Sequence, residues 1–586
     1  MNERDIIETE IWQLYEKGRS FHRLTNIYSD TDINYRMYNG NQWAGAKLGE
    51  VEPAQLNVIE PTVNHKVAVI HSNLYDAVYS SQNYENRAFQ KEAKRYCELL
   101  NGYIRRLWEK DKLGYYGRRI TKDAAINDEG IIYINFDREK MLPVHEVVKK
   151  NDIYYGNEND DNIQMQPYIL IRKRLPVVNA VELALSEGVS EEDTRYITGD
   201  TDNHEESGEA AKIELDEMVT VIYKMYKKNG TVHYSIATRC VDIADDIDTG
   251  LSLYPVAHYV WQEKEGSARG EGLVRRLIPN QIEINRTLVR RLLTVKFQAH
   301  PRTVADRSKI ANPEALSTVG GVIFTQGQTV DDVHKIVGTV PPAQMSPDSK
   351  QVQEELIQYT RELAGAGEVA TGQINPEDAS GRAILAVQQA NQAPITENTE
   401  GYKNFLEDVA RIDLEYLIAY SEDGINMEET IEDPMTGEEY VQMVNVPQTV
   451  LKQLQAVVKI DVTPKGAYDR FAMEQTMENF LMNGFFNPQR VAEFEAYVKA
   501  LPDDSVAPKA DLLEGIENIK KTQQQIAQIN AQAQLMQQRA QQFLMEDPEG
   551  QASQMADAQR QLMMQQQIPG EAEVIAEEEA LPEPQE

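Results

Sequence analysis

The feature that most constrains the fold is one very long helical pattern. It begins at Asn375-Pro376-Glu377-Asp378, which has an N-cap followed by proline, and continues to about Tyr420. These residues would span roughly 65 Å as an unbroken helix. Pro394 lies inside the pattern, where it removes a backbone donor and clashes with the preceding turn. We therefore expect one long helix that is kinked at Pro394.

Two shorter helices are expected before it. The first runs from Leu273 to Ala299 and stops at Pro301. The second opens at 346–348 with Ser-Pro-Asp, and Gly365 ends it. Their apolar stripes are Leu277, Ile284, Leu288, Leu292 and Val295 in the first, and Val352, Leu356, Tyr359 and Leu363 in the second. The chain between them, 302–344, is expected to form short strands and turns, with one strand at 320–325.

The N-terminal half mixes helical and strand patterns. Helices are expected over 1–38 with an interruption at Gly18, over about 60–80, and over 85–113. Strands are expected over 130–136, 168–172, 219–226 and 232–236, with a hairpin at Lys228-Asn229-Gly230 between the last two. The fold class is therefore α+β and mainly helical.

Residues 185–218 differ from this pattern. They carry twelve Asp or Glu residues against Arg195 and Lys212, with little apolar periodicity. We interpret them as an acidic, exposed and partly helical insertion.

The C-terminal part returns to strands and then to helices. Strands are expected at 440–444 and 457–462, and helices at about 467–484, 488–500 and from 511 onward. The last helix carries a heptad pattern of apolar and small residues that suits parallel helix packing. The segment 521–570 holds 17 Gln residues, and the final sixteen residues hold seven Glu and no base, so we expect the tail to be disordered.

Composition limits the classes of protein to which the chain can belong. The 94 Asp and Glu outnumber the 59 Lys and Arg, giving a formal charge of −35. Such a surface repels nucleic acid and anionic membrane, which disfavours a general DNA-coating protein. Any DNA contact must be local, or must depend on the duplex sliding past without adhering. Two cysteines are too few for a disulfide framework or a zinc site. Since no apolar run approaches a membrane span, we expect a soluble protein made in the cytosol.

Motifs for catalysis and cofactor binding are missing. The sequence has no phosphate-binding loop that ends in Gly-Lys-Ser/Thr, no His pair at metal-ligand spacing, and no nucleophile elbow. The glycine-rich stretch 266–272 precedes a helix but has no lysine at the helix start, so we interpret it as a structural strand-to-helix turn. We expect no enzymatic activity, no cofactor and no metal.

A basic segment contrasts with the acidic chain. Residues 269–307 carry nine Lys or Arg against three acids, nine minus three giving +6. The candidate residues on the expected helix are Arg275, Arg276, Arg286, Arg290, Arg291 and Lys296. They either form ion pairs with acidic neighbours in an assembly or contact DNA phosphates from one helix face, and the sequence leaves both interpretations open.

The order of these elements, with short motifs placed along it, resembles the portal proteins of tailed bacteriophages in the podovirus-like branch, the head-to-tail connectors. The motifs are Tyr38-Asn-Gly-Asn-Gln-Trp43, Asn64-His-Lys66, Gly270-Glu-Gly272, Pro279-Asn-Gln281 with Asn285, Gly372 with Asn375, Ala379-Ser-Gly-Arg382, and Ile460-Asp-Val-Thr-Pro464 ahead of Phe471. No single motif is diagnostic, whereas their order over about residues 10–505 is specific.

The resemblance implies a ring of about twelve subunits at one capsid vertex, through which DNA enters and leaves. It divides the chain into a wing (1–267), a first stem helix (268–299), a clip (300–345), a second stem helix (346–364) and a tunnel loop (365–379). These are followed by a long kinked helix (380–421), returning wing strands (422–466), a crown (467–505), a barrel-like helix (506–545) and a Gln/Glu-rich tail (546–586).

The resemblance also implies partners and a location. The partners are further copies of the chain, double-stranded DNA in the channel, the terminase large subunit, the head-to-tail adaptor, the major capsid protein and the scaffolding protein, with no membrane. The location is the capsid portal vertex of the virion, assembled in the cytoplasm of the bacterial host. The candidate tunnel-loop residues are Gly365, Gly367, Glu368 and Gly372, which include no base to grip DNA.

Two other classes stay open. A scaffolding or internal core protein would explain the Gln-rich helical tail, but the 28 Tyr, four Trp and several strands favour a folded wing. A packaging ATPase or nuclease is disfavoured by the missing phosphate loop and by the lack of an acidic metal cluster.

Overall fold

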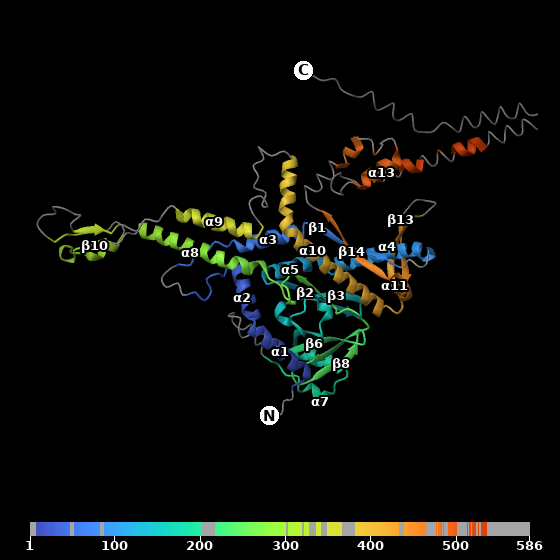
Figure 1. Ribbon diagram of the computed structural model, residues 1–586, viewed down its shortest axis with the longest axis horizontal. Helices are drawn as coiled ribbons and strands as arrows, with labels where there is room; N and C mark the ends of the chain where they lie inside the picture. Colours follow the sequence, from blue (N-terminus) through green and yellow to red (C-terminus); the bar gives the residue numbers. More distant parts are fainter. Residues whose placement is uncertain are drawn as a thin grey trace, which may run out of the picture. The chain divides into compact units, whose positions relative to one another are not determined.

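The computed structural model divides into two compact units, Met1–Pro464 and Lys465–Glu586. The residues that the structure describes are 8–46, 52–82, 87–200, 217–299, 303–318, 322–326, 336–340, 348–365, 381–432, 439–464 and parts of 476–535. The first unit combines long helices with antiparallel sheets, which agrees with the predicted α+β class (Figure 1).

Two helices, α1 (Glu10–Leu24) and α2 (Ile27–Tyr38), open the first unit. The break between them lies at Asn26, which adopts a left-handed conformation with φ 60°. The interruption predicted at Gly18 is wrong, because α1 continues through this residue. Gly18 instead permits close packing, since a Cβ there would lie 2.8 Å from the Tyr154 ring.

The expected helix over 60–80 is only partly present. Helix α3 (Ile59–Ile70) ends at His71, and β1 (Asn73–Ser81) follows as a strand. Strand β1 pairs along its whole length with β14 (Ala456–Pro464), nearly four hundred residues away in the chain. A partner so distant leaves no local signal from which the strand could have been predicted.

Helices α4 (Arg87–Lys110) and α5 (Leu113–Ile126) replace the single helix expected over 85–113. Lys112 separates them in a left-handed conformation with φ 56°. Helix α5, which the sequence reading missed, packs on β2 and α3. Its Gly117 packs against the hydroxyl end of the Tyr402 side chain in a later helix.

Two antiparallel sheets follow. The three-stranded sheet has the order β3-β2-β9, and its strands are β2 (Glu129–Asp137), β3 (Leu142–Val148) and β9 (Val256–Val260). The five-stranded sheet has the order β4-β5-β6-β7-β8, and its strands are β4 (Ile153–Tyr155), β5 (Tyr168–Pro176), β6 (Met218–Lys228), β7 (Thr231–Ala237) and β8 (Asp242–Asp248). The expected hairpin is confirmed, with Asn229 and Gly230 at positive φ between β6 and β7.

The acidic segment 185–218 is described only in part. Helix α6 (Val177–Ser186) ends just inside it, the short helix α7 (Glu191–Thr194) lies in its first half, and residues 201–216 lie outside the described part. The Asp200 amide donates to the Met218 carbonyl at 2.9 Å. This bond joins the end of the described part of the segment to the first residue of β6. Arg174 and Thr220 also bind Asp200 there.

The long helix α8 (Leu273–Ala299) confirms the expected bounds, and Pro279 lies inside it. Helix α9 (Asp348–Leu363) runs back beside α8, and Gly365 follows it at φ 66° (Figure 1). Between them, β10 (Thr303–Ala305) pairs with β11 (Val337–Thr339). The strand expected at 320–325 is not formed by the described residues 322–326, where Thr325 makes only an isolated bridge to Ile310.

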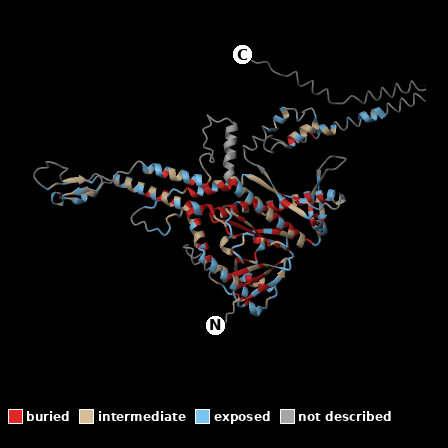
Figure 2. Ribbon diagram, viewed as in Figure 1, coloured by how far each residue is buried: buried red, intermediate tan, exposed pale blue. Residues whose placement is uncertain are grey.

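Helix α10 (Gly381–Tyr420) is the expected long helix, and its Pro394 kink stays a prediction. It packs on β9, β14 and α3 and brings Tyr402, Phe405 and Leu417 into the main core, which Figure 2 shows in red. The hairpin β12 (Ile425–Glu432) and β13 (Glu439–Val446), of which only β13 was expected, then leads through α11 (Gln448–Leu454) to β14.

Short 3-10 helices complete the first unit at Lys150–Asp152, Ile163–Met165, Arg307–Lys309 and Pro313–Ser317. In the second unit, α13 (Val491–Ala500) lies inside the helix expected at 488–500. Residues 476–482 and 512–535 are helical where they are described, as expected. The predicted disordered tail, 546–586, lies outside the described residues.

The contact between α5 and α10 predicts a specific glycine effect. A Cβ on Gly117 would lie 2.1 Å from the hydroxyl of Tyr402, whose ring is fixed among His71, Tyr75 and Phe405. We expect Gly117→Ala to lower the free energy of unfolding by about 1–3 kcal/mol in urea titrations.

The matched control is Gly114→Ala in the same helix, where a Cβ meets no atom within 4 Å. It should be neutral or stabilising by up to about 1 kcal/mol, because alanine favours helix. Equal effects of the two substitutions would contradict the described packing of α5 on α10.

Candidate functional site

The basic helix α8 is held at its base by side-chain amides that bind the backbone of an N-terminal segment. Gln281, which is fully buried, accepts from the Val58 amide at 3.0 Å and donates to the Leu56 carbonyl at 2.7 Å. Asn285, one turn later, accepts from the Leu56 amide at 3.1 Å and donates to Gln42. Two motifs that carried the family resemblance, 38–43 and 279–285, are therefore in direct contact.

The segment that leads into α8 is fixed by a buried ion cluster centred on Arg269. Its guanidinium pairs with Glu129 of β2 and makes two bonds to Glu158, at 2.9 and 3.0 Å. It also donates to Nε2 of His22 in α1 at 2.9 Å and lies over the Tyr155 ring. Arg269 is only 6% exposed.

Charge and burial set the protonation states in this cluster. Burial raises the pKa of Glu129, but the charges of Arg269 and His258 outweigh it and lower that pKa to about 2. Burial lowers the pKa of His22 to about 4, so its ring is neutral and accepts the Arg269 bond. Arg269 is thus the one cation that bonds to both carboxylates, the buried Glu129 and the half-buried Glu158.

Arg269 therefore has a structural role that the sequence did not reveal. Arg269 is one of the nine basic residues of 269–307, for which the sequence allowed either ion pairing or DNA contact. In the structure it forms ion pairs. The only local signal was the neighbouring glycines: a Cβ on Gly270 would lie 2.3 Å from the Gln262 carbonyl, and one on Gly272 would lie 2.5 Å from the Asn127 carbonyl. These distances confirm that the glycine-rich stretch is a packed turn.

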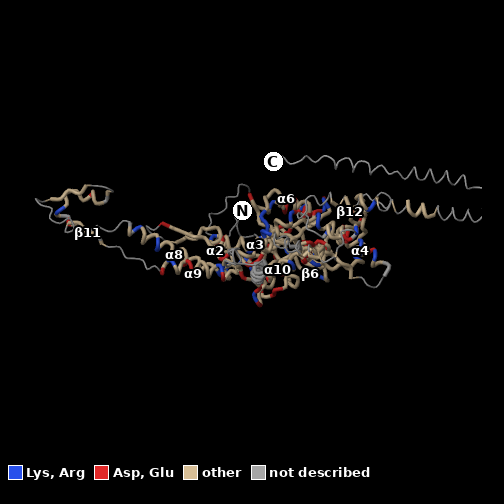
Figure 3. The backbone as a smooth tube through the Cα atoms, turned by 90° about the horizontal axis from the view of Figure 1, so that it is seen from above, with Lys and Arg blue, Asp and Glu red and all other residues tan. Residues whose placement is uncertain are grey.

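Lys and Arg positions are spread along α8 (Figure 3), and the six candidate cations have different partners. Arg275 pairs with Asp30 at 2.7 Å, Arg276 with Glu271 at 3.4 Å, and Arg286 with Glu283 at 2.6 Å. Lys296 lies 4.0 Å from Glu52, and Arg291 donates to Gln353 of α9. Arg290 is exposed and forms no ion pair with any described residue. DNA contact by these residues stays a prediction.

The two long helices leave an apolar stripe uncovered. Gln353 of α9, which binds Arg291 of α8, is buried, as are Thr360 and, just beyond the helix end, Ala364. The expected stripe residues Val352, Tyr359 and Leu363 lie one residue earlier, about 100° around the helix, and are exposed, as are Leu292 and Val295 of α8. The predicted apolar face of α9 is therefore present but unpartnered within the described chain.

The other candidate residues lie at the edge of what is described. Gly365 is seen at the end of α9, whereas Gly367, Glu368 and Gly372 lie outside the described residues. Pro394 lies within α10, but nothing about its side chain is described.

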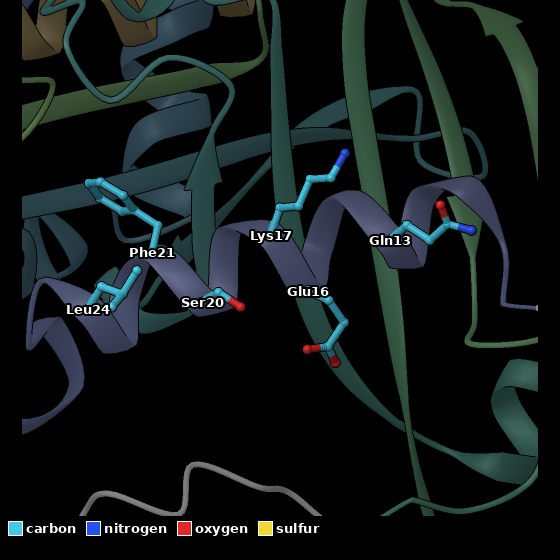
Figure 4. Close-up of a pocket in the computed structure, with 6 residues that line it drawn as sticks. All are labelled: Gln13, Glu16, Lys17, Ser20, Phe21 and Leu24. Carbon is cyan, nitrogen blue, oxygen red and sulfur yellow. The ribbon is translucent and has the colours of Figure 1, made fainter.

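Metal-ligand groups, surface hollows and apolar helices are the remaining features that could carry a function. Among them, no group of three or more His, Cys, Asp or Glu side chains is placed to hold a metal ion. A surface hollow is lined by six residues of α1, namely Gln13, Glu16, Lys17, Ser20, Phe21 and Leu24 (Figure 4). None of the described helices has both the length and the apolar character needed to cross a membrane.

Comparison with known families identifies the chain. The model of the phage P22-like portal protein family matches residues 176–570. The chain belongs to this family. A search of the curated proteins finds no match.

Family membership makes the chain a phage portal protein, which is a structural component of the virion capsid. The matched range contains α8, α9, α10 and Arg269, whereas the cluster partners Glu129 and His22 lie before it. The resemblance inferred from the sequence covered about 10–505, so the match begins later and extends further toward the C-terminus.

The ion cluster predicts a large effect of removing its cation. Arg269→Met would leave Glu129 and Glu158 buried without compensation, and we expect it to lower the free energy of unfolding by about 3–5 kcal/mol. Urea titration of the full chain measures this change. Adding Glu129→Gln should recover part of the loss, because one uncompensated charge is removed.

The matched control is Arg276→Met, seven residues along the chain in a half-exposed pair with Glu271. It should cost less than about 1 kcal/mol. An Arg269 variant as stable as the Arg276 variant would contradict the structural role of the cluster.

Proposed function

We propose that the chain is one subunit of a ring of about twelve copies that forms a DNA channel at one capsid vertex. The supporting observation is the α8–α9 pair, which leaves apolar side chains exposed on both helices. A second copy in a ring would cover such faces, since a head-to-tail arrangement repeats one contact around the axis. Family membership supports the same proposal.

In this proposal α8 and α9 are the two stem helices and 300–345 is the clip. Residues 1–267 and 422–466 form the wing, 365–379 the tunnel loop, 380–421 the kinked helix, 467–505 the crown and 506–545 a barrel-like helix. The base of α8 is rigid, because Gln281 and Asn285 tie it to residues 56–58. Its last three turns carry exposed Arg290 and Lys296.

The charge balance suits a conduit. At −35 per subunit, the ring would repel a moving polyanion and limit its adhesion to the wall. The exposed arginines of α8 would close the ring by pairing with acids of the next copy or would contact passing phosphates. DNA would enter during packaging and leave on infection.

The proposed partners follow from this role. The clip would dock the terminase large subunit during packaging and the head-to-tail adaptor afterwards, and the wing would contact the major capsid and scaffolding proteins. The exposed side chains Val304, Val322 and Phe324 in the clip support a docking role, because such residues cost free energy when left in water. Assembly would occur in the host cytoplasm, without enzymatic activity of the chain itself.

Native mass spectrometry of the full chain, with negative-stain imaging of the same sample, tests the proposal. We expect rings of about a dozen subunits with a central hole. A stable dimer or tetramer without a hole would overturn the ring and favour a scaffolding or core protein. ATP hydrolysis by the purified chain would instead favour an enzyme.

The two alternatives for the arginines of α8 predict different outcomes of charge reversal. Arg286→Glu with Arg290→Glu changes two exposed residues and spares Arg291, which binds Gln353 inside the chain. If Arg286 and Arg290 close the ring, we expect the protein concentration at which half of the chains are assembled to rise roughly tenfold or more. A tenfold rise corresponds to a loss of about 1.4 kcal/mol in the free energy of each contact between subunits. Analytical ultracentrifugation measures it.

The matched control reverses two exposed cations on α4, Lys91 and Lys94. It changes the net charge by the same amount and should leave assembly unaltered. Rings that form equally well from both variants would assign Arg286 and Arg290 to DNA contact instead.

A further inference from the structure

A second basic surface lies on α5, far along the sequence from α8. Between Lys112 and Lys122 the chain has four cations and no acid, in a protein of net charge −35. The exposed or half-exposed residues are Lys112, Tyr115, Arg118, Arg119 and Lys122, which we call the α5 basic face. Their spacing of three to four residues places them along one side of the helix.

The opposite side of α5 accounts for its packing. Leu113, Ile120 and Ala124 are buried against neighbouring elements, so the helix is held firmly in the fold. The α5 basic face is thus not needed for the core. Its cations are presented on a rigid support about 15 Å long.

The acids at both ends of this face are already engaged. Asp111 accepts from His145 at 3.0 Å, and Asp123 accepts from the Tyr35 hydroxyl at 2.7 Å. Arg119 lies 4.0 Å from Asp123, at the limit of an ion pair. Lys112 and Arg118 form no ion pair with the described residues.

A further cation extends the face. The exposed Lys149 acts on Asp123 together with Arg119 and Lys122, and all three charges lower the pKa of a carboxyl that burial raises. Lys122 also lies 4.7 Å from the centre of the Tyr38 ring. Asp123 is thus the acid on which these cations act, and of the three Arg119 has the ion-pair distance to it.

From this arrangement we propose that the α5 basic face binds the phosphate backbone of duplex DNA, as a contact separate from α8. Lysine and arginine neutralise phosphates, and the phenol of Tyr115, which is 66% exposed, is a hydrogen-bond donor for a phosphate oxygen. A protein partner fits less well, because the centres of protein interfaces are depleted of lysine and this face offers no exposed aliphatic side chain.

Binding of a short fluorescein-labelled duplex of random sequence to the full chain tests the proposal. Fluorescence anisotropy is followed over a salt series for the wild type, for Lys112→Gln with Lys122→Gln, and for Arg118→Gln with Arg119→Gln. Each double variant should weaken binding roughly tenfold or more and reduce the slope of log K against log salt by about two, since two phosphate contacts are lost.

The matched control is Lys91→Gln with Lys94→Gln on α4, which removes the same charge from another exposed helix surface. Its affinity and salt slope should equal those of the wild type. Equal weakening in all variants would overturn the proposal, because it would show a general charge effect. No detectable binding by the wild type at low salt would also overturn it.

The inference rests on the proposed function only in that the DNA would be the phage genome. Native mass spectrometry of the same variants distinguishes failure of the α5 site from failure of the proposed ring. Intact assemblies with weakened DNA binding support the α5 site, whether or not those assemblies are rings. Variants that lose assembly but bind DNA normally would show that the face contacts another copy of the chain, and would overturn the DNA assignment.

Discussion

The buried pairing of Arg269 with Glu129 and Glu158 is the interaction on which the arrangement of the first unit depends. It joins α1 through His22, the β3-β2-β9 sheet through Glu129, and the chain that enters α8. Buried ions are costly unless each is compensated, so these elements are stable only together. The cluster thereby links α1, the three-stranded sheet and the base of α8.

Rigidity at one end of α8 and exposure at the other follow from this anchoring. Leu273, Val274 and Leu277 are buried at the start of the helix. Gln281 and Asn285 form hydrogen bonds with the backbone of residues 56–58. Beyond them the helix is covered mainly by α9, and Leu292 and Val295 remain exposed. A rigid base with a projecting, partly apolar pair of helices is what a ring needs to repeat one contact around its axis.

The sequence predicted the local features of this fold and missed the distant ones. The α8 and α9 helices and the β6–β7 hairpin depend on periodicity, capping and the Asn229-Gly230 turn, which are visible in a few residues. Strand β1 could not be recognised, because its partner β14 lies nearly four hundred residues away. Gly18 looked like a helix break, and only the Tyr154 ring explains why a glycine stands there.

The same limit applies to the candidate site. The basic residues of α8 could be found by counting charged residues along the sequence. The environment of Arg269 could not, because it depends on His22, Glu129 and Glu158 from three other segments. The exposed stripe on α9 was visible as a pattern, but its lack of a partner within the described chain required the structure.

A cryo-electron microscopy map of the assembled full-length chain tests the central claim most directly. The account predicts a ring in which α8 and α9 surround a central hole, with Val352, Tyr359 and Leu363 covered by the neighbouring copy and the Arg269 cluster intact. A map in which these helices lie on the outer surface, or in which no hole is present, would contradict it.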